Sequence, residues 1–239
     1  MLPLKFAYIT GCLIAFVIWI TIFIKRKDLR AEMLMMSLGV SLLGLTEVLF
    51  WGSYWKPEFI LQFGEFKIGL ESFLICFLYG GAFGALYELI TRKTPIRSKK
   101  LNGGRSIFLK SMILGVVILL ITYKLLHLNL VYASAISMFT ISISFIYFRK
   151  DLWVSIVLSG VLGLLIALIT YFILNKLYPE MGIQWYITDG LSGIKLFNFP
   201  IEEILWHVPL AMVLSSMYEV IYNRWDRRLA HVIDKSAHN

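Results

Sequence analysis

Seven runs of about twenty apolar residues divide this chain, and each is long enough to cross the hydrocarbon core of a bilayer as a helix. We place them at residues 4–24, 31–54, 70–90, 107–126, 129–148, 152–174 and 200–222. Lipid offers no hydrogen bonds to a backbone, so each run must satisfy its own polar groups by forming a helix. Once the runs are removed, no stretch is long enough for a soluble domain. The sequence therefore predicts an all-α integral membrane protein with seven transmembrane helices.

Residues 107–148 could be taken as one apolar run instead of two. A single helix of that length would measure about 63 Å, which is twice the thickness of the hydrocarbon core. We therefore predict a break at residues 126–129 and a separate helix on each side of it.

The distribution of Lys and Arg supports this number of spans. If the N-terminus lies outside, 17 of the 23 Lys and Arg residues fall on the inner side, at 25–30, 92–110, 149–150 and 224–235. Cytoplasmic segments carry such an excess. We predict a cell-membrane protein with its N-terminus outside and its C-terminus in the cytoplasm. The net charge of +8 then reflects contact with membrane lipids, and no nucleic-acid partner is expected.

A faint internal repeat runs through the chain. Residues 66–90 recur at residues 197–221, with 6 identities in 25 positions and an offset of 131. The Arg-Lys-Asp-Leu segment at 26–29 likewise recurs at 149–152, with an offset of 123. Because these matches occur in the same order, they indicate a duplicated module.

The repeat predicts a division of the chain into four parts. These are a first three-helix repeat at 1–93, a basic cytoplasmic loop with a linker helix at 94–128, a second three-helix repeat at 129–225, and a cytoplasmic tail at 226–239. Three helices are an odd number, so one linker helix gives both repeats the same orientation. We predict two parallel repeats in a 3+1+3 arrangement, with one site built from both.

Carboxylates stand at the outer ends of three of the apolar runs. Glu202 and Glu203 follow Pro200 at the start of the last run, Glu71 has the matching place in the third, and Glu47 lies near the outer end of the second. Acids within a membrane are costly and usually functional. Two adjacent carboxylates do not both ionise cheaply, so one holds a proton that it can donate. These four are our candidate catalytic residues, and helix capping is the alternative interpretation.

Aromatic side chains and one histidine accompany these acids. His207 lies one turn after Glu203, so the two share a helix face. Ring faces can stabilise a cation or hold a polyene, although an interfacial aromatic belt would give the same pattern. The candidate substrate-binding residues are Trp206, His207, Trp51, Trp55, Trp185 and Tyr79. Cys12 and Cys76 both fall inside apolar runs, so we expect neither a disulfide nor a metal site.

The segment from Asp189 to Trp206 resembles the signature of a membrane lycopene cyclase family. It reads Asp-Gly-Leu-Ser-Gly-Ile-Lys-Leu-Phe-Asn-Phe-Pro-Ile-Glu-Glu-Ile-Leu-Trp and is followed by Tyr218-Glu219. The family pattern is Pro-x-Glu-Glu at the start of a helix, then aromatic residues and a later Tyr-Glu. The resemblance implies proton-initiated ring closure, without a cofactor, at the end of a linear carotenoid or related isoprenoid.

By this resemblance, Glu202 and Glu203 occupy the acidic positions of the family motif. The first copy of the motif departs from the pattern, because residues 69–72 read Gly-Leu-Glu-Ser and lack both the proline and the second acid. The second copy has Trp206-His207 where the family usually has paired phenylalanines.

Two other functions remain open from the sequence. Small sugar transporters also have a 3+1+3 arrangement, so a small-molecule transporter or binding protein is possible. Such a protein needs a polar centre, for which spans four to six offer mostly Ser and Thr. A retinal photoreceptor would need a lysine in its last span, and residues 200–222 contain none. The sequence does not indicate an oligomeric state.

Overall fold

The computed structural model describes residues 2–65, 67–91, 95–97 and 103–226. Within these residues, seven helical segments are long and apolar enough to cross a membrane: Leu4–Lys25, Lys27–Phe50, Leu70–Thr91, Gly104–Leu125, Leu130–Phe148, Lys150–Leu177 and Ile201–Tyr222. The prediction of an all-α membrane fold with seven spans is confirmed. Residues 227–239 of the predicted tail, and residues 92–94 and 98–102 of the predicted basic loop, lie outside the described residues.

The helices are α1 (Ala7–Lys25), α2 (Arg30–Ser41), α3 (Glu47–Phe50), α4 (Leu70–Thr91), α5 (Gly104–Leu120), α6 (Leu130–Phe148), α7 (Trp153–Leu177), α8 (Met181–Gln184) and α9 (Ile201–Tyr222). Short 3-10 segments are η1 (Leu4–Phe6), η2 (Lys27–Leu29), η3 (Leu42–Thr46) and η5 (Lys150–Leu152), and η4 (Ile121–Leu125) is a π-helical turn. In the described residues, β1 (Pro95–Arg97) pairs antiparallel with β4 (Arg224–Asp226), and β2 (Lys195–Leu196) with β3 (Phe199–Pro200).

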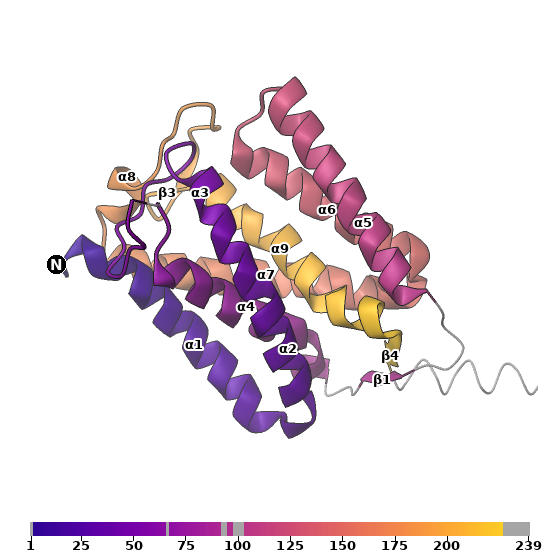
Figure 1. Ribbon diagram of the computed structural model, residues 1–239. Coiled ribbons are helices and arrows are strands. Elements are labelled where there is room, and N and C mark those ends of the chain that lie inside the picture. The colour runs from indigo at the N-terminus through magenta and orange to yellow at the C-terminus, as the bar shows by residue number, and fades with distance from the viewer. Residues whose placement is uncertain (1, 66, 92–94, 98–102, 227–239) are drawn as a thin grey trace, which may run out of the picture.

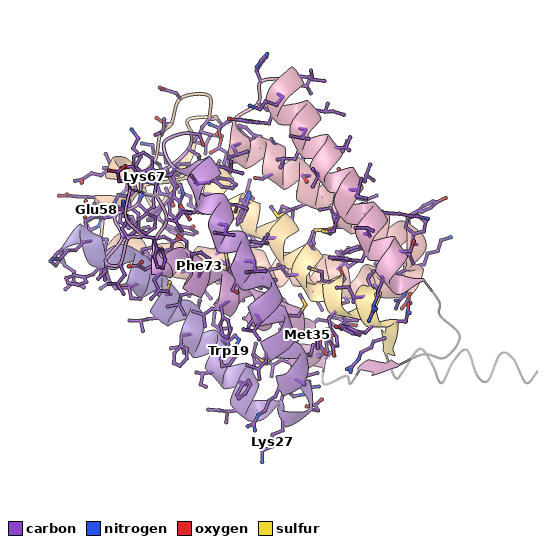
Figure 2. All side chains as sticks on the ribbon, in the orientation of Figure 1. Trp19, Lys27, Met35, Glu58, Lys67 and Phe73 are labelled. Atoms are coloured by element: carbon purple, nitrogen blue, oxygen red, sulfur yellow. The ribbon has the colours of Figure 1, made fainter. Side chains whose placement is uncertain are left out.

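Two ends of the bundle can be distinguished (Figure 2). Lys27, at the corner between α1 and α2, lies at one end, and Glu58 and Lys67, in the loop before α4, lie at the other. We call the first the inner end and the second the outer end, after the predicted orientation. That orientation itself stays a prediction.

The predicted break between the fourth and fifth spans is confirmed. The helix α5 passes into the π-helical turn η4, and α6 begins at Leu130. His127 has a positive φ of 53°, which reverses the chain. The Asn129 side chain then accepts the backbone N–H of Val131 at 3.2 Å and so caps α6. The break therefore follows from local capping chemistry.

The second span departs from the prediction of one helix over residues 31–54. The helix is interrupted by the 3-10 segment η3 and ends at Phe50, because Trp51 is extended with ψ at 122°. A Cβ placed on Gly44, within η3, would lie 2.9 Å from the Cα of Phe73. Only glycine permits this approach to the start of α4. Such 3-10 stretches inside a helix often mark functional segments.

The helices pack in the same pattern in two halves of the chain. In the first half (α1–α4), α4 packs against α1 and α2; in the second half (α6–α9), α9 packs against α6 and α7. The helices α4 and α9 meet at the centre, and α5 packs on α6 and α9. Figure 1 shows α1 and α2 on one side of α9, and α5 and α6 on the other. The 3+1+3 prediction requires this pattern.

Small residues allow the close approach of the paired helices. A Cβ on Gly80 of α4 would lie 2.7 Å from the carbonyl oxygen of Met36 on α2. A Cβ on Gly163 of α7 would lie 2.5 Å from the Cβ of Ala211 on α9. Close backbone contact of this kind is the usual basis of helix association in membranes.

The first Arg-Lys-Asp-Leu segment forms a corner at the inner end, between α1 and α2. Arg26 donates hydrogen bonds to both carboxylate oxygens of Asp28, at 2.9 and 2.8 Å. Its guanidinium also donates to the backbone carbonyl of Glu88, near the end of α4. The corner is thereby fixed to the third helix of its half.

The second Arg-Lys-Asp-Leu segment forms the same corner between α6 and α7. Arg149 donates to both carboxylate oxygens of Asp151, at 2.9 and 2.7 Å, and to the carbonyl of Glu219 at 3.1 Å. It makes one further bond, to the carbonyl of Arg224 at 2.6 Å. The contacts of the repeated residues therefore recur in both halves.

Candidate active site

A cavity of about 240 Å³ lies between the two halves of the bundle. Its lining comes from the first half, from the second half and from the loops at the outer end. It reaches Leu214, about three turns along α9 from Glu203. Most of the lining is apolar, and the carboxylates in it are Glu47 and Glu203. Each half therefore contributes one acid to the same cavity.

Both carboxylate oxygens of Glu203 accept hydrogen bonds from tyrosines. The Tyr54 hydroxyl donates to Oε2 at 2.5 Å, and the Tyr171 hydroxyl donates to Oε1 at 2.6 Å. Hydroxyl bonds of this length are typical of an ionised acceptor. The two tyrosines come from different halves, so Glu203 is held by both.

Glu47 is less completely bonded. The Tyr8 hydroxyl donates to Oε2 at 3.2 Å, and Oε1 is buried without a hydrogen-bond partner. Buried polar atoms nearly always have a partner, so such an atom at a cavity calls for an explanation. One explanation is that this oxygen faces a ligand instead of a group of the protein.

His207 is held in one tautomer at the wall of the cavity. Its Nδ1 lies 2.9 Å from the backbone carbonyl of Glu203, which can only accept, so Nδ1 carries the hydrogen. The Nε2 atom is then free to accept from the Tyr79 hydroxyl, at 3.3 Å. The imidazole is therefore oriented by two bonds.

Four aromatic residues of the outer loops cover the cavity, and we call them the aromatic roof. Tyr54 and Trp55 come from the first half, and Trp185 and Tyr186 from the second. The ring centroids are 5.5 Å apart for Tyr54 and Tyr186 and 6.3 Å apart for the two tryptophans. The carbonyls of Tyr54 and Trp185 each accept an N–H from the opposite loop, at 2.8 and 2.6 Å. Burial first, and the neighbouring Glu203 second, raise the pKa of both tyrosines, so the roof is uncharged.

Glu71 lies outside the cavity lining and holds a loop instead. Its Oε1 accepts the backbone N–H of Ile60 at 2.7 Å and that of Leu61 at 3.4 Å. The side chain is buried at the start of α4. It therefore anchors the loop that leads into this helix.

Glu202 has the same role in the second half. Its Oε1 accepts the backbone N–H of Ser192 at 2.7 Å and the Tyr132 hydroxyl at 2.5 Å. Ser192 follows Leu61 by 131 residues, which is also the offset between Glu71 and Glu202. Of the four predicted acids, the cavity thus brings together Glu47 and Glu203.

Most of the predicted substrate-binding residues reach the cavity. Those that line it are Trp206, His207, Trp55 and Tyr79. Trp185 packs behind Trp55 as part of the roof and is almost fully buried. Trp51 does not line the cavity. The Lys67 ammonium lies 4.5 Å from the centroid of the Trp51 ring.

Four tyrosines that bond the acids are not among the candidates predicted from the sequence. They are Tyr8, Tyr54, Tyr132 and Tyr171, and each donates to a carboxylate of another element. Each lies within two turns of the outer end of its span. A buried hydroxyl needs an acceptor, and the carboxylates at that end are the obvious ones. That requirement was the signal available in the sequence.

Residues 129–221 match a family model described as Lycopene cyclase. The match includes Glu202 and Glu203, and it does not extend to Glu47 or Glu71. Searches of curated proteins and of solved structures gave no match.

Proposed function

Residues 129–221 match the family model described as Lycopene cyclase, and from this premise we propose that the chain closes a ring at the end of a linear carotenoid or related isoprenoid. The observation that carries the proposal is the position of Glu203. It belongs to the matched domain, and it lines an apolar cavity together with a second acid, Glu47, from the other half.

The apolar lining of the cavity supports a hydrocarbon substrate. Pockets for drug-sized ligands measure about 300–1,000 Å³, whereas this one measures about 240 Å³. The proposal is therefore that the end group of a carotenoid enters the cavity and the rest of the chain stays in lipid. The apolar lining gives little support to a transporter of polar solutes, which needs a water-filled centre.

The first chemical step is protonation by Glu47. In its neutral form, Glu47 presents the proton on Oε1, the oxygen that has no partner in the protein. The terminal double bond of the substrate takes this proton, and its π electrons form the new C–H bond. The carbocation that results is attacked by a second double bond of the chain, which closes the ring.

The second step is proton removal by Glu203. Two tyrosine hydroxyls stabilise its carboxylate, so it serves as the base and as the counter-charge of the carbocation. It takes a proton from a ring carbon, and the C–H electrons form the new double bond. One proton enters and one leaves, so the reaction is an isomerisation with no net redox change. The rings of Trp55 and Trp206 line the same cavity and add cation–π stabilisation.

The test is pigment analysis of a lycopene-accumulating host that expresses the chain. Glu47→Gln and Glu203→Gln keep the shape of the side chain and remove the titratable group, so we expect a loss of about 10²–10⁴ in rate. Glu71→Gln and Glu202→Gln are matched controls, because an amide oxygen still accepts the loop N–H groups. The controls should keep most of the activity.

Two outcomes would contradict the proposal. If the wild-type chain is inserted in the membrane at normal level and leaves lycopene linear, it is not a lycopene cyclase. If Glu202→Gln abolishes ring closure while Glu203→Gln preserves it, the base is not the carboxylate that lines the cavity. Protein level and thermal unfolding of each variant separate loss of chemistry from loss of fold.

The proposal includes two parallel repeats with the N-terminus outside. The matching corners of Arg26 and Arg149 and the matching loop contacts of Glu71 and Glu202 support the repeats, and the distribution of Lys and Arg supports the orientation. A topology reporter placed after Lys100 should give a cytoplasmic signal, and one placed between residues 180 and 189 an external signal. Both signals on one side of the membrane would contradict the seven-span orientation.

A further inference from the structure

We propose that the substrate enters the cavity sideways from the lipid, through an opening between η3–α3 of the first half and α6–α9 of the second. We call this the side opening, and its rim is Leu43, Thr46, Phe50, Met138 and Trp206. The occupant is a linear isoprenoid that inserts its end group and leaves its remaining length in the bilayer. The identity of this occupant rests on the proposed function.

The exposure of the lining residues locates the side opening. Among all residues that line the cavity, the exposed ones are Leu43, at 49%, and Thr46. Both belong to η3. Met138 and Trp206, from the other half, are partly exposed. In Figure 1, α3 lies on one side of α9 and α6 on the other. The cavity therefore reaches the lipid-facing surface along η3.

The 3-10 geometry of η3 creates this rim. With three residues per turn, side chains at positions i and i+3 lie directly above each other. Leu43 and Thr46 therefore share one side of the segment, which faces the cavity. Leu42 and Leu45 share another side; they are 65% and 54% exposed and do not line the cavity. The second half has no such interruption, because α7 runs unbroken from Trp153–Leu177.

Two aromatic rings of the rim each share a helix face with one of the cavity acids. The rings of Phe50 and Trp206, from opposite halves, meet edge to face with centroids 6.4 Å apart. The indole N–H of Trp206 donates to Ser134 Oγ at 2.9 Å, which fixes the ring. Glu47 precedes Phe50 by three residues, and Glu203 precedes Trp206 by three, so each acid shares a helix face with its aromatic neighbour. A chain end that passes the rings thus meets both acids.

The chemistry of the rim favours an isoprenoid over a phospholipid. The five rim residues are all uncharged, and Thr46 already donates its hydroxyl to the carbonyl of Leu43 at 2.6 Å. No group of the rim is suited to a phosphate. A hydrocarbon without a headgroup is therefore the occupant that fits.

The experiment compares Leu43→Trp with Leu42→Trp, two identical changes in adjacent exposed leucines. Both are made in the Glu203→Gln background, so that bound substrate is not consumed, and each protein is purified from a lycopene-accumulating host. Lycopene bound per protein is measured by absorbance after extraction. We expect Leu43→Trp to lower it about tenfold, because the indole fills the opening. Leu42→Trp should leave it unchanged.

The outcomes are separable from those of the proposed function. Equal binding by Leu43→Trp and Leu42→Trp, or a Glu203→Gln parent protein that holds phospholipid and no lycopene, overturns the side opening. Loss of binding in Leu43→Trp, together with a wild-type protein that binds lycopene and closes no ring, supports the opening and rejects the cyclase reaction. If Leu43→Trp fails to fold, Thr46→Trp fills the same rim and decides the question by the same measurement.

Discussion

The outer ends of the two halves hold their loops in the same way and place their reactive acids differently. Glu71 and Glu202 make matching contacts to the loop before their helix. The next residue is Ser72 in the first half and Glu203 in the second. Only Glu203 lines the cavity. The acid that the halves share holds a loop, and the acid that they do not share lines the cavity and is the one for which we propose a chemical role.

The other acid of the cavity belongs to the first half and is matched by a threonine in the second half. Glu47 lies in the first half, and the residue 123 positions later is Thr170. Both residues line the cavity. The two halves therefore contribute different acids from different helices. One asymmetric site with two distinct carboxylates suits a reaction that needs both an acid and a base.

The largest expected effect comes from making the second half resemble the first. Glu203→Ser should lower ring closure by about 10²–10⁴, the usual cost of losing a positioned acid–base group. Adding Ser72→Glu should not restore it, because Ser72 does not line the cavity. Chromatography of the pigments measures both. Recovery of activity in the double variant would show that the halves are interchangeable.

The next largest effect is a difference in stability between variants of the two inner corners. Arg149 is 1% exposed and Arg26 is 15% exposed. We expect Arg149→Ala to lower the free energy of unfolding by about 3–5 kcal/mol, since it removes the buried partner of Asp151 and two hydrogen bonds to carbonyls. Arg26→Ala should cost about 1 kcal/mol or less, because its partner Asp28 is 40% exposed. Unfolding in detergent measures the free energy of unfolding of both variants. Equal losses of free energy would contradict this ranking by burial.

A smaller loss of stability is expected, and it should be equal in the two halves. Glu71→Ala and Glu202→Ala each leave a loop N–H without its acceptor, at a cost of about 1–3 kcal/mol in unfolding free energy. Glu71→Gln and Glu202→Gln should recover most of it. Thermal unfolding of the four variants measures the comparison. If Glu202→Ala were as stable as the wild-type protein, the shared loop-holding role would be refuted.

The smallest effect is predicted for the residue that matches Glu47. Thr170→Val keeps the shape of the side chain and removes a hydroxyl that takes no part in the proposed reaction. The rate should change by less than about tenfold, which corresponds to ~1.4 kcal/mol. A single-turnover assay with lycopene in liposomes measures it. A loss as large as that of Glu47→Gln would assign Thr170 a role in proton transfer.

Much of the fold was predictable because the membrane imposes it. Each span agrees with a helix of the structure to within a few residues, and the break before α6 was found from length alone. The interruption at η3 was not found. It depends on the contact of Gly44 with Phe73, which are distant in sequence.

The acids of the candidate site were predictable from the sequence, but their surroundings and their tyrosine partners were not. All four acids were identified from their place in apolar runs, but this signal is the same for Glu202 and Glu203. Consecutive residues of an α-helix point about 100° apart. Two adjacent acids therefore face different surroundings, and here one faces a loop and the other a cavity.

The sequence by itself determined the class of protein, the number of spans and the residues available for proton transfer, because hydropathy and charge act locally along the chain. The tertiary structure decided which acids meet. Glu47 and Glu203 are 156 positions apart, and only the packing of the two halves around α4 and α9 brings them to one cavity. The tyrosines that bond them also come from other elements, so the surroundings of each carboxylate are a property of the assembled bundle.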